Sequence, residues 1–288
     1  MSTAIRAISE TADDYPARLR DLRDAPKGIW VRGTLPPGPY VAVVGTRRAT
    51  PEAEAFTERL AGELARGGAT IVSGGADGID AAAHRGALLA QGRTIVVQPA
   101  ALDRPYPRSN AALFARVLDG GGAWLSETPL GRRPERWRFL ARNRIIAALA
   151  DVVVVVQAPI RSGALSTARF ARTLGRVLYA VPGAPWDPRA DGTNLLLVQG
   201  ARLCRDAADV ALALGVPAAT EPRPRGVDGG LPPDPQAVLR ALAEGPAHVD
   251  VLVSRTGLSA ARVQAALVEL SMAGLARRDT SRWRAARP

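Results

Sequence analysis

Short apolar runs of strand length alternate with helical segments along most of the chain, and this alternation constrains the fold more than any other feature. The apolar runs are VAVVG (41–45), ATIVS (69–73), TIVVQ (94–98), AWLSE (123–127), VVVVVQ (152–157) and RVLYAV (176–181). They are continuous, which is typical of parallel strands buried on both faces. Helical patterns occupy about 50–68, 79–90, 109–118, 135–149 and 163–173. The sequence therefore predicts a doubly wound, mostly parallel α/β sheet with a ligand crevice at the carboxyl ends of its strands.

Composition shifts divide the chain further. Residues 216–235 hold six prolines and three glycines, which is typical of a linker. The expected parts are an N-terminal lead-in (1–39) that docks on the main domain, the α/β domain (40–215), the linker (216–235) and a small winged-helix domain (236–288). Because the linker separates two domains, we expect residues 1–215 to fold alone.

The winged-helix prediction rests on three short helical segments, the third capped by Ser259, and on a basic stretch after them. That stretch, ARRDTSRWRAARP, carries five arginines against one aspartate and could form a β-wing. Two interpretations remain open: the domain contacts DNA, or it binds protein or merely stabilises the chain. The accessory DNA contacts would be Arg262, Arg277, Arg278 and Arg282.

Charge and composition narrow the function classes. The net charge of +11 favours an anionic partner, nucleic acid above all, although an arginine-rich chain can also reflect a GC-rich genome. Lys27 is the only lysine and has no glycine-rich loop before it, so a P-loop is excluded. The single cysteine, Cys204, excludes an internal disulfide and a cysteine zinc cluster, and we expect no metal and no cofactor. Without a signal-like N-terminus or an apolar run of ~20 residues, we expect a cytoplasmic protein without membrane insertion.

Three predicted strands end in small residues that lead into helices. The first ends in Gly45-Thr46-Arg47, the second in the glycine-rich SGGADGID (73–80), and the fifth leads to RSGALSTAR (161–169). Free backbone N–H groups and the helix dipole at such turns favour an anion. The pattern lacks the G-x-G-x-x-G order of a dinucleotide site.

These motifs together resemble one family. The strings VGTRRAT, SGGADGIDAAAHRGAL, LDRPYPRSN, SETPLG, FLARNRIIAALAD, SGALSTARFA-x-x-x-GR, AVPG and G-x-N-L-L-x-x-GA follow one another in order over about residues 13–205. This set is similar to the DNA-processing protein A family (DprA/Smf), many members of which carry a C-terminal winged helix.

The resemblance implies a Rossmann-like domain that protects incoming single-stranded DNA and loads RecA recombinase onto it in natural transformation (competence). It implies a binding protein rather than an enzyme, and we expect a homodimer. The family's pocket arginine corresponds to Arg47, and its basic-plus-aromatic pair to Arg136 and Phe139. An aromatic ring offers a face on which a base can stack. The residues expected to contact single-stranded DNA are Gly45, Thr46, Arg47, Ser73, Gly74, Gly75, Gly78, Arg136, Phe139, Arg142, Asn143, Ser162 and Gly163.

The chain departs from the family pattern near this pocket. Pro99 and Ala101 stand where glycines are usual, Gln157 stands where glutamate is common, and Asp77 adds a negative charge to the glycine turn. These departures are expected to change the pocket's geometry but not the fold.

Other functions remain open. Asp80 and His84, one helical turn apart, could act with Ser73 in acid–base chemistry, although such a pair is more often a local helix contact. Related folds also include nucleotide-binding sensors and hydrolases. The hydrolase string P-G-G-x-G-T-x-x-E has only SGALSTARF (162–170) as its nearest match, without the proline or the glutamate. A further alternative is a winged-helix regulator with an α/β effector domain.

Overall fold

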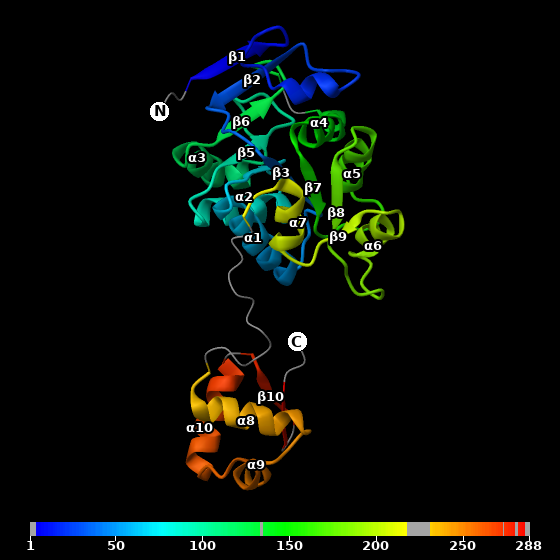
Figure 1. Cartoon of the computed structure of the whole chain (residues 1–288). Helices are drawn as coiled ribbons and strands as arrows, with labels where there is room; N and C mark the ends of the chain where they lie inside the picture. Colours follow the sequence, from blue (N-terminus) through cyan, green and yellow to red (C-terminus); the bar gives the residue numbers. More distant parts are fainter. Residues whose placement is uncertain (1–3, 133–134, 218–230, 273, 280–281, 286–288) are drawn as a thin grey trace. The chain divides into compact units, whose positions relative to one another are not determined.

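The computed structural model describes residues 4–132, 135–217, 231–272, 274–279 and 282–285, with Arg136 and Asp279 described for their backbone only. The chain divides into two compact units, Met1–Glu221 and Pro222–Pro288, and each is described here by itself (Figure 1). Within the described residues, no helix has the length and apolar character needed to cross a membrane.

The first unit is built on a nine-stranded sheet, as far as the described residues extend, in the order β1-β2-β6-β5-β4-β3-β7-β8-β9. Its strands are β1 (Ile5–Ser9), β2 (Gly28–Gly33), β3 (Tyr40–Val44), β4 (Thr70–Ser73), β5 (Thr94–Val97), β6 (Ala123–Ser126), β7 (Val152–Val155), β8 (Val177–Ala180) and β9 (Arg202–Leu203). The strands from β3 to β9 pair in parallel. The chain builds outward from β3 to β6 and then returns to place β7 on the other side of β3. This reversal is the switch point at which doubly wound folds bind ligands.

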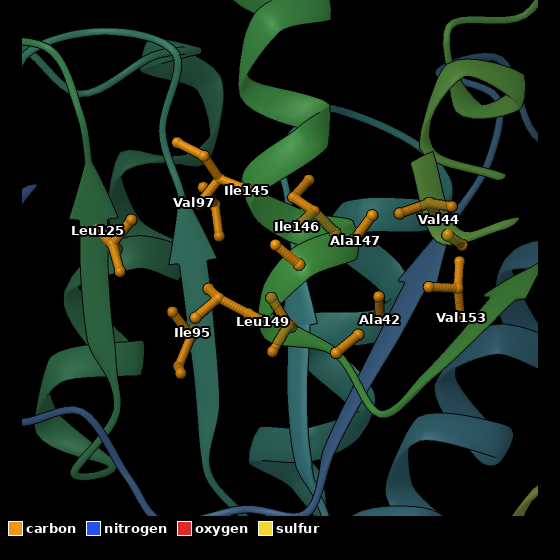
Figure 2. Close-up of a cluster of buried hydrophobic side chains, with 14 of the residues drawn as sticks. Ala42, Val44, Ile95, Val97, Leu125, Ile145, Ile146, Ala147, Leu149 and Val153 are labelled. Atoms are coloured by element: carbon orange, nitrogen blue, oxygen red, sulfur yellow. The ribbon is translucent and has the colours of Figure 1, made fainter. Parts of the chain in front are cut away.

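Helices cover both faces of the sheet, because the central strands are apolar on both sides. The helices are α1 (Pro51–Arg66), α2 (Ile79–Leu89), α3 (Ala111–Asp119), α4 (Arg136–Leu149), α5 (Ala164–Thr173), α6 (Asp191–Val198) and α7 (Ala207–Leu214), with 3-10 turns η1 (Ala17–Asp21) and η2 (Arg108–Asn110). Val41 and Val43 of β3 pack in the cluster with α1, α2 and α7, whereas Ala42 and Val44 pack in the cluster with α4 and α5. Figure 2 shows the second cluster, in which Ile146 of α4 lies near β3 and β5.

The doubly wound, mostly parallel fold predicted from the sequence is confirmed, and the predicted helices and strands begin and end within about two residues of their expected positions. The sequence analysis did not predict α6, β9 and α7, which follow β8. Thr50 caps α1 by accepting a hydrogen bond from Ala53 N at 3.1 Å. The N-terminal lead-in differs from expectation, because it adds two antiparallel strands, β1 and β2, beside β6. Only Ile8 of β1 is buried, so its sequence carries little apolar pattern.

The second unit is a winged helix, as predicted. It contains α8 (Pro233–Ala243), α9 (Val249–Thr256), α10 (Ala260–Met272) and a hairpin of β10 (Ala276–Asp279) and β11 (Arg282–Ala285). The three helices and the hairpin share one apolar core, which includes Leu252 and Leu267. α8 begins at Pro233, inside the predicted linker 216–235, because proline suits the first turn of a helix. Most of that linker lies outside the described residues.

Candidate functional site

A cavity of about 330 Å³ lies at the switch point, where β3 and β7 end. Its lining comes from residues 44–48 after β3, from the start of α2, from one side of α4 and from the turn at 159–164. A smaller hollow of about 40 Å³ shares Arg47, Phe139 and Arg142 with it. Segments far apart in the sequence thus meet at the predicted edge of the sheet.

A larger cavity of about 630 Å³ lies at the opposite edge, where residues 33–37, Arg93 and 118–122 precede β3, β5 and β6. Its charged lining side chains are Arg93 and Asp119, whose charges oppose each other. This cavity therefore offers an anion no net attraction from its own lining, and we assign the site to the switch point.

Arg47 and two aromatic rings form a cluster at the cavity. Arg47 is exposed, and its guanidinium carbon lies 5.2 Å from the centre of the Phe139 ring. Tyr106 meets Phe139 edge to face, with 5.2 Å between ring centres and 81° between ring planes. The loop that carries Arg47 is held by Thr46 N, which donates to Gln157 O at 2.7 Å. A cation over an aromatic face is a favourable contact, and both of its members line the two hollows.

Arg142 is a buried cation under this cluster. Its guanidinium donates to Gly74 O at 2.6 Å and also to Val97 O. Burial lowers the pKa of Arg142 to about 10, with Asp80 opposing that shift and Arg47 adding to it. Arg142 therefore remains charged at neutral pH and both lines the cavity and braces the ends of β4 and β5.

Asn143 fixes the far wall of the cavity. Its side-chain amide donates to Gly163 O at 3.1 Å and to Ser166 Oγ at 2.8 Å. Ser162 Oγ accepts a hydrogen bond from Ala164 N at 3.3 Å. The N-terminal end of α5 therefore lines the cavity, where the helix dipole favours an anion.

The predicted glycines have different roles. Gly45, Gly74 and Gly163 line the two hollows, whereas Gly75 and Gly78 do not. Gly78 has a φ of +74°, and a Cβ there would lie 2.5 Å from Thr46 O, so it permits close packing against the Arg47 loop. At Gly163, by contrast, a Cβ would meet only Leu140 Cδ2, at the ordinary contact distance of 3.8 Å.

Ser73 does not present its side chain to the cavity. It is fully buried, and its hydroxyl donates to Val43 O at 2.6 Å. Arg136 begins α4, but its side chain lies outside what the structure describes, so its role remains a prediction from the sequence.

The Asp80–His84 pair has no geometry for acid–base catalysis. His84 is fully buried, and burial lowers its pKa to about 3, so the imidazole is neutral. Its Nδ1 lies 2.7 Å from Oγ1 of Thr94, which donates its own proton to Ile71 O. His84 therefore acts as a donor inside the domain, away from the cavity.

The departures from the family pattern are accommodated locally. Oε1 of Gln157 accepts a hydrogen bond from Thr50 N at 3.0 Å, so this side chain anchors the start of α1. Asp77 is exposed and accepts a hydrogen bond from Ser109 Oγ at 3.2 Å. Ala101 is fully buried, as is the adjacent Ala100.

The sequence analysis missed several side chains at the site. Tyr106, Leu140 and Arg161 line the hollows. Tyr106 belongs to the string LDRPYPRSN, which follows the strand predicted at 94–98. An aromatic residue shortly after a predicted strand was the signal that could have placed Tyr106 at the site.

The predicted accessory arginines lie in the second unit. Arg262 of α10 donates to the two carboxylate oxygens of Asp234, from Nε at 2.6 Å and from Nη2 at 2.5 Å. Arg277, Arg278 and Arg282 lie exposed on the hairpin. Within the described ranges, no group of His, Cys, Asp and Glu has a metal-binding arrangement.

Fold and site together define a Rossmann-like α/β domain with an arginine- and aromatic-lined pocket at its switch point, followed by a winged helix. The chain belongs to the DNA recombination-mediator protein A family, whose model matches residues 6–215, and the model of the DprA winged helix domain matches residues 216–280.

Relatives and solved structures agree with this assignment. A DNA processing protein DprA of Mycobacterium tuberculosis is 41% identical over 97% of this chain and 76% of its own length. Protein Smf of Escherichia coli is 36% identical over 93% of this chain and 74% of its own length. The crystal structure of DprA from Streptococcus pneumoniae matches with a TM-score of 0.68 and 38% identity, over 72% of this chain and 74% of that chain. DNA processing protein A from Helicobacter pylori, solved to study its single-stranded DNA binding mode, matches with a TM-score of 0.64 and 35% identity, over 74% of this chain and 98% of that chain.

Proposed function

We propose that this protein binds single-stranded DNA in the switch-point cavity and acts as a binding protein rather than an enzyme. The observation that carries the proposal is the placement of Arg47 over Phe139 at a cavity that is also lined by the N-terminal end of α5. Sites that bind single strands without sequence preference usually combine arginines, which contact the phosphates, with an aromatic ring on which a base stacks. The Helicobacter pylori relative, described for single-stranded DNA binding, supports the same ligand class.

The cluster suggests how a strand is bound. A base that stacks on Phe139 would replace the guanidinium of Arg47, which then reaches an adjacent phosphate. Arg142, held in place by the carbonyls of Gly74 and Val97, adds a fixed positive charge beneath. Asn143 keeps the Gly163 turn in position for a second phosphate.

Affinity measurements with three ligand types test this function. Oligo-dT should bind more tightly than a duplex of equal length, with little dependence on sequence. Its affinity should fall with salt with a log–log slope of roughly 0.7 per phosphate contacted. Tighter binding to the duplex would contradict the proposal.

A nucleotide sensor is the second candidate, because a cavity of about 330 Å³ is within the range of small-ligand sites. In that case a free mononucleotide should saturate the site, and oligo-dT should bind no better than the mononucleotide. Equal affinity for the two would favour this alternative.

We also propose that the protein loads RecA recombinase onto the bound strand during natural transformation, acting as a homodimer in the cytoplasm. Membership of the recombination-mediator family supports this step. The test is RecA filament assembly on DNA coated with single-strand-binding protein. If the full chain does not stimulate RecA filament assembly, the proposed RecA loading is contradicted, whereas the proposed binding of single-stranded DNA is not.

A further inference from the structure

Among the aromatic side chains that the structure describes, Trp186 is the most exposed, at 85%. It belongs to the segment 181–190 between β8 and α6, which we call the β8 loop. Its side chain does not line the switch-point cavity. Isolated exposed apolar side chains are common on protein surfaces, so exposure alone gives Trp186 no role, and its setting decides.

Hydrogen bonds fix the backbone of the β8 loop around Trp186. Gly183 N donates to Oδ1 of Asn194 at 3.1 Å, and Nδ2 of Asn194 donates back to Gly183 O at 3.0 Å. Asp187 N donates to Ala184 O at 2.9 Å, which closes a turn around the tryptophan. One proline directly precedes Trp186 and another follows two residues after it, so the backbone is restricted further. A side chain displayed on such a turn loses less conformational freedom on binding than one on a loose loop.

The β8 loop leaves the sheet beside the switch-point cavity. The strand order is β3-β7-β8 and the three strands are parallel, so β8 ends at the same edge as β3 and about 10 Å from it. Directly after the loop, Gly192 N donates to Ala158 O at 2.8 Å, next to the cavity wall at 159–164. Toward α1, Arg189 of the loop interacts electrostatically with Glu52. A strand that leaves the cavity on this side therefore reaches the β8 loop within a few nucleotides.

Two arginines of the cavity provide positive charge for such a route. Arg48 and Arg161 are exposed and line the cavity, and among the described residues no carboxylate pairs with either guanidinium. Arg189 is neutralised by Asp187, whose Oδ1 accepts from its N and its Nε, each at 2.9 Å. The attraction for phosphate therefore comes from Arg48 and Arg161, whereas an apolar protein segment on Trp186 would leave both cations unpaired.

We propose that Trp186 is a second stacking platform for the bound single strand, which runs from Phe139 in the cavity, past Arg48 and Arg161, to the exposed indole. This inference rests on the proposed function and adds to it a further binding residue and the direction in which the strand leaves the cavity. One base stacks on each ring, and the phosphates between them lie near the two arginines. Because every base has a π-face, the platform adds affinity without sequence preference.

Binding of oligo-dT to the full chain as a function of length tests the second platform. Strands of about 4 to about 16 nucleotides cover the usual site sizes of a single-strand binding domain. Trp186→Ala should bind the shortest strand as the wild type does, and the longest at least about 5-fold more weakly, because only a longer strand reaches the indole. Trp186→Phe keeps a stacking face and should retain most of the affinity. Leu89→Ala, which removes a 69% exposed side chain at the opposite edge of the sheet, is the matched control and should follow the wild type at every length.

Salt dependence separates stacking from charge. Trp186→Ala removes no phosphate contact, so its log–log slope with the longest strand should equal that of the wild type. Arg161→Gln should lower the slope by roughly 0.7, the value for one phosphate contact. Thermal unfolding checks that each variant is folded.

Trp186→Ala that binds the longest strand as tightly as the wild type would overturn the second platform, even where Phe139→Leu shows that the cavity binds DNA. If the same variant also loses RecA loading, Trp186 contacts a protein and not a base. A wild-type chain that binds oligo-dT of no length contradicts the proposed function itself, and the second platform with it.

Discussion

The guanidinium of Arg47 lies over the ring of Phe139, with 5.2 Å from its central carbon to the ring centre. Arg47 follows β3, whereas Phe139 belongs to α4, which the chain reaches only after β6. The return of the chain to place β7 beside β3 brings α4 over this edge of the sheet. The topology thus places a cation and a stacking surface at one cavity, and the next two predictions depend on that pair.

Replacing the Phe139 ring should weaken single-strand binding without unfolding the protein. Phe139→Leu keeps an apolar side chain of similar size but removes the flat π-face, so it should cost about 1–3 kcal/mol of binding. Phe139→Trp keeps a stacking face and should retain most of the affinity. Fluorescence anisotropy with labelled oligo-dT measures both variants, and wild-type affinity in Phe139→Leu would show that no base stacks there.

Reversing the charge at Arg47 should abolish measurable binding, because phosphate would meet a carboxylate beside Asp80. Arg47 is exposed, so the free energy of unfolding should change by no more than about 0.5 kcal/mol. The matched control is Arg169→Glu, since Arg169 lies over Phe170 at 5.7 Å but does not line the cavity. Equal losses in the two variants would indicate a general charge effect rather than a site. The same loss is expected for Arg136→Glu from the sequence alone.

The strands and helices of the α/β domain could be predicted because continuous Val and Ile runs are unmistakable when a sheet is buried on both faces. Arg47 and Gly163 could be placed for the same reason, since each follows a predicted strand and parallel strands end at one edge. β1 was missed because an edge strand buries little and shows no such run. β2 was missed because it buries alternate residues, Ile29 and Val31, and so also lacks a continuous apolar run.

The misplaced or missed site residues have local causes. Ser73 follows the strand-end rule, but its hydroxyl turns inward to the Val43 carbonyl. Tyr106 lies in the segment between β5 and α3, whose path is set by contacts such as Gln98 Oε1 with Tyr106 N, at 3.0 Å. No periodicity in the sequence encodes a contact of this kind.

Two glycine substitutions should separate stability from affinity. A Cβ on Gly74 would lie 2.4 Å from the Arg142 guanidinium, so Gly74→Ala must displace a buried, hydrogen-bonded cation. We expect a loss of about 1–3 kcal/mol in unfolding free energy. Gly163→Ala points into the cavity and should leave stability unchanged while lowering affinity for oligo-dT several-fold. Urea unfolding and anisotropy on both variants measure this contrast, and equal stability of the two would contradict the role given to Arg142.

Stability should fall as the pH is lowered below about 6.5, because His84 is buried in its neutral form. The folded-state pKa is about 3 and the unfolded value is 6.5, so between these values the unfolded chain binds more protons. The loss attributable to His84 between pH 7 and pH 5 is about 2 kcal/mol. The pKa of Asp80 is raised by burial, so its contribution has the opposite sign.

His84→Leu should remove this part of the pH dependence, because leucine does not titrate. The substitution should be tolerated, since the Nε2 atom of His84 has no hydrogen-bond partner in the described structure and Thr94 keeps its bond to Ile71 O. His248→Leu, at an exposed histidine, provides the control for the effect of the substitution itself. Urea unfolding at pH 5, 6 and 7 measures all three proteins. The same pH slope in His84→Leu as in the wild type would contradict this assignment.

The α/β domain alone should keep most of the single-strand affinity and the RecA loading. The predicted boundary at residue 215 would remove Val216, which packs against the cluster beneath α1 and α7, so the better truncation ends at residue 217. The switch-point cavity lies wholly within this part, and the winged helix would add affinity only by raising effective concentration. Oligo-dT binding and RecA filament assembly on coated DNA should therefore be compared for residues 1–217 and the full chain. A folded truncation that binds DNA but no longer loads RecA would assign the mediator step to the winged helix.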